Sequence, residues 1–217
     1  METTCERPRI LCLHGTGANS DITALQLHGL NLSSSAECKF LNAPHTAPKC
    51  WPGLQFFSQG PWFSWSVEEN HWEESLVFLA DFCKKNGPFD GVYGFSQAAG
   101  LITNFSHPSI WRDRFEFDRC PWKFAILACG ADSSCMDIQQ NDASKIDLPS
   151  FHIFGEKDPI LADGQALEPY WNTEKRMKYT HTRGHEIDMN MTRREPELGK
   201  LLKDFLDEQK NDYVDEY

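Results

Sequence analysis

The residues from Gly94 to Ala98 read Gly-Phe-Ser-Gln-Ala, so that a small residue stands two positions before the serine and another two positions after it. An apolar run that ends in Val92 and Tyr93 precedes this segment, and a stretch rich in Ala, Leu and Ile follows it. Strand, tight turn and helix in that order predict a nucleophile elbow, which exposes the serine hydroxyl at the edge of a sheet. Ala98 replaces the usual second glycine. The alternative is that Ser96 is only a turn serine that caps its helix.

A serine that transfers acyl groups needs a base and a group that orients this base. On this kind of fold the chain order is serine, acid, histidine. Asp158 stands just past the apolar run 151–154, and His185 follows Gly184 after a later strand-like segment. We assign Ser96 as the nucleophile, His185 as the general base and Asp158 as the residue that orients His185.

Other residues compete for these roles. Asp158 could instead form an Asx turn before Pro159. The competing acids are Asp132 and Glu156, and the competing histidines are His14, His45, His152 and His181. The sequence has no paired His/Cys spacing and no glutamate that would make His181 and His185 a zinc helix. We therefore expect no metal and no cofactor.

The negative charge that develops on a substrate oxygen requires fixed donors, for which backbone N–H groups are suited. We expect one donor at Gln97, directly after the nucleophile. The second should come from the loop 14–17 after the first strand, and we assign it to Thr16. That loop could also be a plain glycine-rich turn. A phosphate-binding loop is disfavoured because no Gly-Lys-Ser/Thr ending is present.

Six aromatic residues crowd the segment between Trp51 and Trp65. They either pin a long loop onto the body of the protein or form an apolar wall for an acyl chain, and pockets for small molecules are mostly apolar. Trp62 and Phe63 are our candidate substrate-binding residues, although they could equally be structural.

The elements that would position these residues alternate between strands and helices. Continuous apolar runs predict buried parallel strands, and three-to-four spacing predicts amphipathic helices. The expected strands are 9–13, 38–42, 91–95, 124–129, 151–154 and 177–180, and the expected helices are 22–30, 67–85, 97–105 and 195–209, with a long loop over 44–66. This alternation predicts an α/β fold with a mostly parallel sheet covered on both faces.

The chain has 217 residues and a formal net charge of −11, with eight cysteines. Its length predicts one domain over residues 1–217, with 211–217 as a loose acidic tail. The acidic balance argues against nucleic acid and anionic membranes as partners, and no apolar stretch is long enough to span a bilayer. Without a visible signal peptide, we expect a cytoplasmic protein with free thiols, and we expect the sequons at Asn31, Asn104 and Asn190 to be chance.

Four segments resemble the FSH family of serine hydrolases. They are Asn86–Ala99 around the elbow, Ile10–Gly15, Asn42–His45, and Trp62-Phe63 before a helix. The family usually has aspartate where Asn42 stands and glycine where Ala98 stands. The resemblance implies an α/β-hydrolase fold and the same three residues, Ser96, Asp158 and His185.

Three functions follow from these residues and this resemblance. The first is a carboxylic ester hydrolase that works through an acyl-enzyme on small-molecule esters. The second is a thioesterase that releases a polyketide or fatty acyl group from coenzyme A or from an acyl carrier protein, as the polyketide-releasing members suggest. The third is a ligand-binding protein without turnover, because function lies in the site rather than in the fold.

Overall fold

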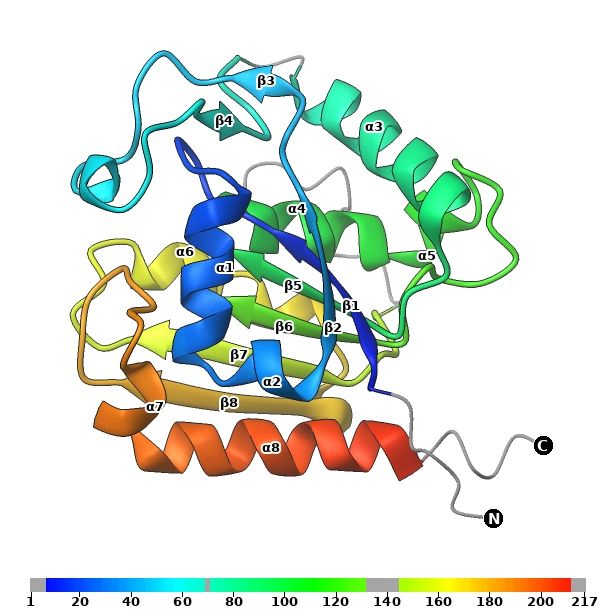
Figure 1. The fold of residues 1–217 in the computed structure, drawn as a ribbon. Coiled ribbons are helices and arrows are strands. Elements are labelled where there is room, and N and C mark those ends of the chain that lie inside the picture. The colour runs from blue at the N-terminus through cyan, green and yellow to red at the C-terminus, as the bar shows by residue number, and fades with distance from the viewer. Residues whose placement is uncertain (1–6, 69–70, 132–144, 212–217) are drawn as a thin grey trace.

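The computed structural model describes residues 7–68, 71–131 and 145–211. Within them, six parallel strands form one central sheet in the order β2-β1-β5-β6-β7-β8 (Figure 1). The strands are β1 (Arg9–Leu13), β2 (Glu37–Leu41), β5 (Gly91–Phe95), β6 (Phe124–Ala128), β7 (Ser150–Gly155) and β8 (Arg176–His181). All six predicted strands are thus confirmed, with bounds that differ by at most two residues.

Helices cover both faces of this sheet, as the alternating pattern predicted. Because side chains alternate along a strand, Leu11 and Leu13 enter one core while Ile10 and Cys12 enter the other. The first core is completed by α3 (His71–Asn86) and α4 (Gln97–Ser106), and the second by α1 (Ser20–Gly29) and α8 (Pro196–Asn211) (Figure 1). The sheet therefore lies between two apolar layers, and its strand ends carry the loops of the site.

The two long outer helices form for the reasons that their spacing suggested. In α3, Leu76, Leu79 and Cys83 are buried along one face, and acidic residues in the first turn with lysines in the last turn suit the helix dipole. This helix begins at His71 rather than at residue 67; residues 69–70 are not described. In α8, Leu198 and Leu202 are among the buried residues that face the sheet.

The segment 44–66 is not a plain loop, and here the prediction was incomplete. It contains a two-stranded antiparallel sheet of β3 (His45–Thr46) and β4 (Phe63–Ser64), with the 3₁₀ turn η1 (Leu54–Phe56) between them. Phe63 pairs with both Thr46 and Ala18, which fastens the segment to the loop after β1. The other short elements are α2 (Leu32–Ser35), α5 (Pro108–Trp111), α6 (Leu161–Gln165), η3 (Glu168–Tyr170), η4 (Thr173–Lys175) and α7 (Met191–Arg194).

Three further expectations can be placed on the described part of the chain. Six cysteines are free thiols there, while Cys5 and Cys135 lie outside it. Asn104 is 1 % exposed within α4, so its sequon is inaccessible in the folded protein. Within residues 7–68, 71–131 and 145–211, every helix is too short or too polar to span a bilayer. The competing acid Asp132 and residues 212–217 of the predicted tail lie outside the described residues.

Candidate active site

Ser96 occupies a strained turn between β5 and α4. Its backbone has φ 55° and ψ −120°, a conformation that residues with a side chain rarely adopt. The turn is held from the neighbouring strand, because the Ser96 N–H donates to the carbonyl of Ala128 and the Ala131 N–H donates to the carbonyl of Ser96. The predicted elbow context of strand, turn and helix is therefore present, with the hydroxyl at the N-terminal end of α4.

Close contacts explain why the neighbours of Ser96 are small. A Cβ on Gly94 would lie 2.4 Å from Cδ1 of Ile102 and 3.0 Å from the carbonyl carbon of Ala98. A Cβ on Gly15 would lie 3.1 Å from Cβ of Ser96. Ala98 itself is fully buried. The loop after β1 therefore lies so close to Ser96 that it leaves little room for a side chain at Gly15.

His185 and Asp158 meet Ser96 in an unbroken chain of hydrogen bonds. Nε2 of His185 lies 2.9 Å from Oγ of Ser96, and Nδ1 lies 2.8 Å from Oδ2 of Asp158. The other oxygen of Asp158 accepts the N–H of Ile160 at 2.9 Å. Asp158 is 7 % exposed, so its carboxylate is fixed by hydrogen bonds instead of by water. This geometry places Nε2 to receive the hydroxyl proton.

The other candidate residues have different partners. Glu156 is exposed, and the buried His152 lies 3.1 Å from the hydroxyl of Ser150. Burial lowers the pKa of His152 to about 3 and that of His14 to about 4. The structure thus brings Ser96, Asp158 and His185 together and leaves these competitors elsewhere.

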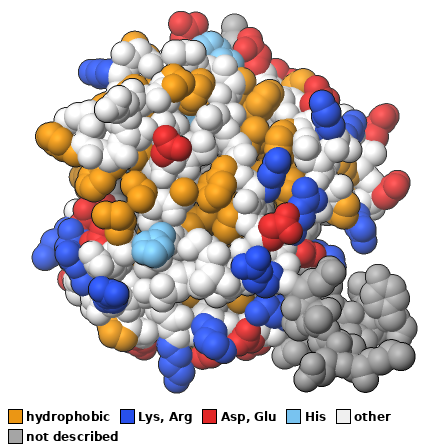
Figure 2. All heavy atoms as spheres, viewed as in Figure 1, with side chains coloured by type: hydrophobic (Ala, Val, Ile, Leu, Met, Phe, Trp, Pro, Cys, Tyr) orange, Lys and Arg blue, Asp and Glu red, His pale blue; other side chains and the backbone are white. Residues whose placement is uncertain are grey.

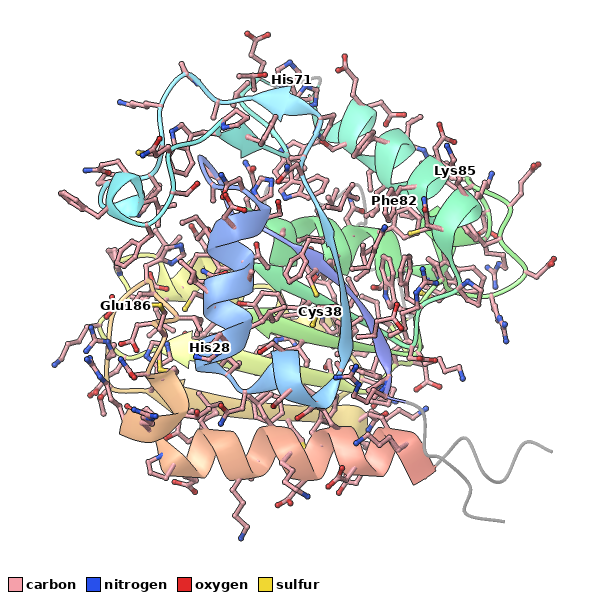
Figure 3. The ribbon with its side chains drawn as sticks, viewed as in Figure 1. His28, Cys38, His71, Phe82, Lys85 and Glu186 are labelled. Carbon is pink, nitrogen blue, oxygen red and sulfur yellow. The ribbon has the colours of Figure 1, made fainter. Side chains whose placement is uncertain are left out.

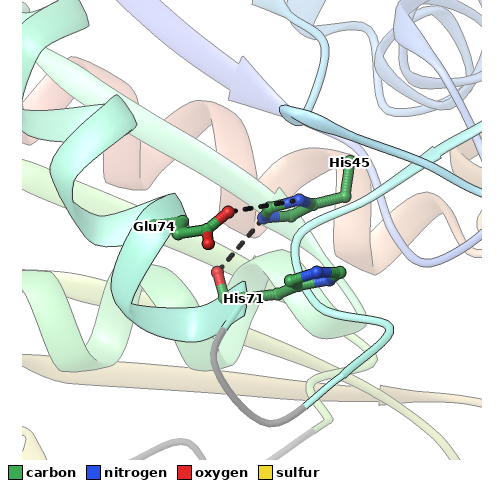
Figure 4. Close-up of side chains that lie close together, drawn as sticks. All are labelled: His45, His71 and Glu74. Atoms are coloured by element: carbon green, nitrogen blue, oxygen red, sulfur yellow. Dashed lines mark hydrogen bonds and ion pairs between the residues drawn. The ribbon is translucent and has the colours of Figure 1, made fainter.

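His45, the histidine that precedes the serine in the chain, belongs to a separate cluster with His71 and Glu74 (Figure 4). Its ring stacks on that of His71 at 3.8 Å between centroids, with 5° between the planes, and its Nδ1 lies 3.8 Å from the Glu74 carboxylate. The lone pairs of a ring nitrogen lie in the ring plane, so two parallel rings do not aim at one point. We read this cluster as a contact that fastens β3 to the start of α3.

The two residues predicted to supply oxyanion donors are Thr16 and Gln97. Thr16 borders the cavity beside Ser96, and Gln97 is the first residue of α4, whose N–H has no intrahelical acceptor. Within the described residues, neither N–H donates to a protein acceptor.

The loop that carries Thr16 is held by His14. This buried imidazole accepts the N–H of Ala43 at Nε2, and its Nδ1 lies 2.7 Å from the carbonyl of Gly15. Because burial lowers the pKa of His14, the ring stays neutral and can donate from Nδ1 while it accepts at Nε2. The indole of Trp65 donates to the His14 carbonyl at 2.7 Å. From the sequence, His14 was predicted only as a competing base.

The side chain of Gln97 has a structural role that the sequence did not reveal. Its Oε1 accepts the N–H groups of Trp65 and Ser66, and its Nε2 donates to the Ser66 carbonyl. The residue that follows the nucleophile therefore also ties down the end of the aromatic segment.

A buried thiol lies on the inner side of the Asp158–His185 pair. Sγ of Cys129, a carboxylate oxygen of Asp158 and a ring nitrogen of His185 all lie within 4.8 Å of one another. Cys129 has φ 45°, and its sulfur is 3.7 Å from Nε2 of the buried His181. Burial raises the pKa of this thiol, so it remains protonated. The sequence placed Cys129 in a central strand and gave no sign of this contact.

A cavity of about 580 Å³ opens beside Ser96 and His185. Trp51 and Phe95 pack against the His185 ring, at 5.8 and 5.0 Å between centroids. The cavity is bordered by both apolar and charged residues. Figure 3 labels one of the charged residues, Glu186, on the segment that follows β8. The cavity lining includes Ile22, Leu25, Trp51, Leu54, Phe57, Ile187 and Met189, with Arg183, Glu186, Asp188 and Arg194.

Trp62 and Phe63, our candidate substrate-binding residues, do not line this cavity. Phe63 belongs to β4 and packs against the core instead. The aromatic side chains of this segment that do border the cavity are Trp51 and Phe57. Pairing of β4 with β3 turns Phe63 inward, which the composition of the segment could not indicate.

Comparison with known proteins places this geometry in a family. Residues 1–195 match the family model described as serine hydrolase (FSH1). Esterase FPY3 of Fusarium mangiferae is 31% identical over 201 residues, which cover 82% of this chain and 88% of that protein. Esterase FUS5 of Gibberella moniliformis is 34% identical over 175 residues, covering 74% of this chain and 71% of that protein.

A solved structure shows the same fold. The carboxylesterase from Mesorhizobium loti superposes with a TM-score of 0.62 at 16% identity, over 93% of this chain and 88% of that one. The predicted α/β-hydrolase fold is thereby confirmed. From the family match and the relatives together, this chain belongs to the FSH1 family of serine hydrolases.

Proposed function

We propose that the protein hydrolyses carboxylic esters through an acyl-enzyme formed on Ser96. The observation that carries this proposal is the continuous hydrogen-bond chain from the Ser96 hydroxyl through His185 to Asp158. The family supplies the class of enzyme, and this chain of contacts supplies the residues that would perform the reaction.

In the first half of the reaction, Oγ of Ser96 attacks the ester carbonyl carbon while its proton passes to Nε2 of His185. The carbonyl oxygen becomes an oxyanion, which the N–H groups of Thr16 and Gln97 would stabilise. Collapse of this intermediate breaks the bond to the alcohol, which leaves with the proton from His185. Asp158 holds His185 in the tautomer that these transfers require.

In the second half, a water molecule gives its proton to His185 and attacks the acyl carbon. The same two N–H groups stabilise the second oxyanion. The bond to Oγ of Ser96 then breaks, the serine recovers its proton from His185, and the carboxylic acid leaves. The enzyme returns to its starting state without any additional group.

The cavity supports an acyl group as the recognised part of the substrate. Its lining includes Leu25, Leu54 and Phe57, which would contact hydrocarbon and exclude water. The four charged residues that line it are two arginines and two acids, so that the lining carries no net charge. An uncharged ester with an apolar acyl part fits these surfaces.

The test is the turnover of p-nitrophenyl esters by Ser96→Ala, with Ser34→Ala, an exposed serine on α2, as the matched control. We expect Ser96→Ala to lose at least a thousandfold in kcat at an unchanged melting temperature. Any residual rate would come from the oxyanion donors and binding groups, which remain in the variant. Acyl-CoA of the same chain lengths is measured alongside. Turnover of the thioesters alone would assign the protein to acyl-thioester release, with coenzyme A or an acyl carrier protein as the donor. Full activity in Ser96→Ala would reject the acyl-enzyme.

A further inference from the structure

Four exposed apolar side chains line the Ser96 cavity or, in the case of Phe56, stand next to a residue that lines it. They are Trp51 (48 % exposed), Phe56 (82 %), Phe57 (56 %) and Met189 (43 %), and together we call them the aromatic rim. The only other exposed large apolar side chains in the described residues are Val67 and Val77. Figure 2 shows hydrophobic side chains gathered over this side of the molecule. Such clustering at one opening marks a contact surface more often than chance exposure does.

The rim is held outward by a fixed turn. The Trp51 N–H donates to the Gly17 carbonyl at 2.9 Å at one end of η1. At the other end, the Ser58 hydroxyl accepts from Asn19 and donates to Asp21. Figure 1 shows η1 projecting from the body beyond α1. Since both ends are anchored, the exposure of Phe56 is a property of the folded protein.

The rim is continuous with the cavity. Trp51, Phe57 and Met189 each line the cavity and also face solvent, whereas Phe56 stands on the same turn outside the lining. A surface that covers the rim would therefore cover the entrance. Apolar molecules that leave this surface could reach Ser96 without crossing water.

Charge and size indicate what would cover the rim. Arg183 pairs with Glu186 and Asp188, and Arg194 pairs with Asp188 at 3.2 Å, so the neighbouring charges are balanced. A balanced surface on a chain with a net charge of −11 does not favour an anionic membrane. The rim exposes on the order of 400 Å² of apolar area, about half of what each partner of a stable dimer buries. A projecting aromatic tip of this size suits the headgroup region of an uncharged or zwitterionic lipid layer.

We propose that the aromatic rim docks on the surface of a zwitterionic phospholipid bilayer and that the enzyme draws its ester from this layer. Phe56 inserts deepest, and Trp51 and Phe57 lie between the lipid and the cavity. This proposal rests on the proposed ester hydrolysis for its purpose, but the docking step needs no turnover.

The experiment is flotation of the full-length protein with phosphatidylcholine vesicles. Phe56→Ser should lower the fraction bound about tenfold, because this side chain would lose its burial in lipid. Val77→Ser, on α3 and 42 % exposed, is the matched control and should bind like the wild type. Ser96→Ala should also bind like the wild type, which separates docking from catalysis.

Three outcomes would overturn the docking proposal. The first is failure of the wild type to bind phosphatidylcholine vesicles, and the second is equal binding by Phe56→Ser. The third is a concentration-dependent dimer in sedimentation velocity that Phe56→Ser abolishes, which would make the rim an interface between two copies. Hydrolysis of a short water-soluble ester should be unchanged in Phe56→Ser. Loss of that activity in Ser96→Ala alone would support ester hydrolysis whatever the vesicles show.

Discussion

Gly155 and Gly184 touch at the point where the acid and the histidine loops meet. A Cβ on Gly155 would lie 2.2 Å from the carbonyl oxygen of Gly184, which no real contact permits. Gly155 ends β7, three residues before Asp158, and Gly184 directly precedes His185. This close approach of two backbones sets how far His185 can reach over Ser96.

Gly155→Ala should therefore displace the His185 loop. Because the clash is with backbone, the loop must move, and a misplacement of about 1 Å typically costs on the order of a hundredfold in rate. Gly184→Ala is the control, since a Cβ there would meet its nearest atom at an ordinary 3.5 Å. Steady-state kinetics of both variants tests this. Equal activities would show that the glycine contact does not position the histidine.

Asp158→Asn should keep the fold and lose most of the rate. An asparagine can donate a hydrogen bond to Nδ1 of His185, which favours the tautomer whose Nε2 carries the proton and cannot accept one from Ser96. A loss of about 10³–10⁴ in kcat is expected for a wrong tautomer. Melting temperature and kcat are measured together. A variant that keeps its rate would remove Asp158 from the mechanism.

Gln97→Ala should destabilise the protein as well as slow it. The N–H groups of Trp65 and Ser66 would lose their hydrogen-bond acceptor. Leaving these two donors without an acceptor should lower the free energy of unfolding by about 2–3 kcal/mol. Gln97→Glu keeps the acceptor but loses the donor to the Ser66 carbonyl, so it should lose less. Urea denaturation of the two variants measures the difference. The same loss in both would mean that the acceptor is not the group that matters.

Stability should fall as the pH drops from 7.5 to 5, in part because of His152. Its pKa is lowered to about 3 in the folded protein, mainly by burial, so the unfolded chain binds a proton in this range that the folded chain does not. This proton uptake favours unfolding by about 2 kcal/mol at pH 5. His152→Gln should remove that part of the pH dependence. An identical slope in the variant, measured by urea denaturation at each pH, would contradict the assignment.

The central sheet could be predicted from the sequence because its strands coincide with continuous apolar runs. β1 and β5 begin and end at the predicted residues. The helices of three to five residues and the two-residue strands, such as α6 and β4, were missed because they are too short to show a period. β4 also depends on partners in β3 and at Ala18, which lie far away in the chain.

The candidate site followed from residue types and chain order, and the surroundings of the site did not. A serine between small residues, with an acid and a histidine later, led to three side chains that meet in space. The contact of Cys129 with the Asp158–His185 pair comes from the pairing of β6 with β7, which no local pattern records. For the same reason the sequence pointed to Trp62 as a substrate contact, although Trp51 is the tryptophan beside the imidazole.

The most direct test of the central claim is labelling of the folded protein with a fluorophosphonate, followed by peptide mapping. We expect one adduct, on the hydroxyl of Ser96, that forms at a much lower rate in His185→Ala. A folded wild-type protein that stays unlabelled at Ser96, or that carries the adduct on another residue, would contradict that claim.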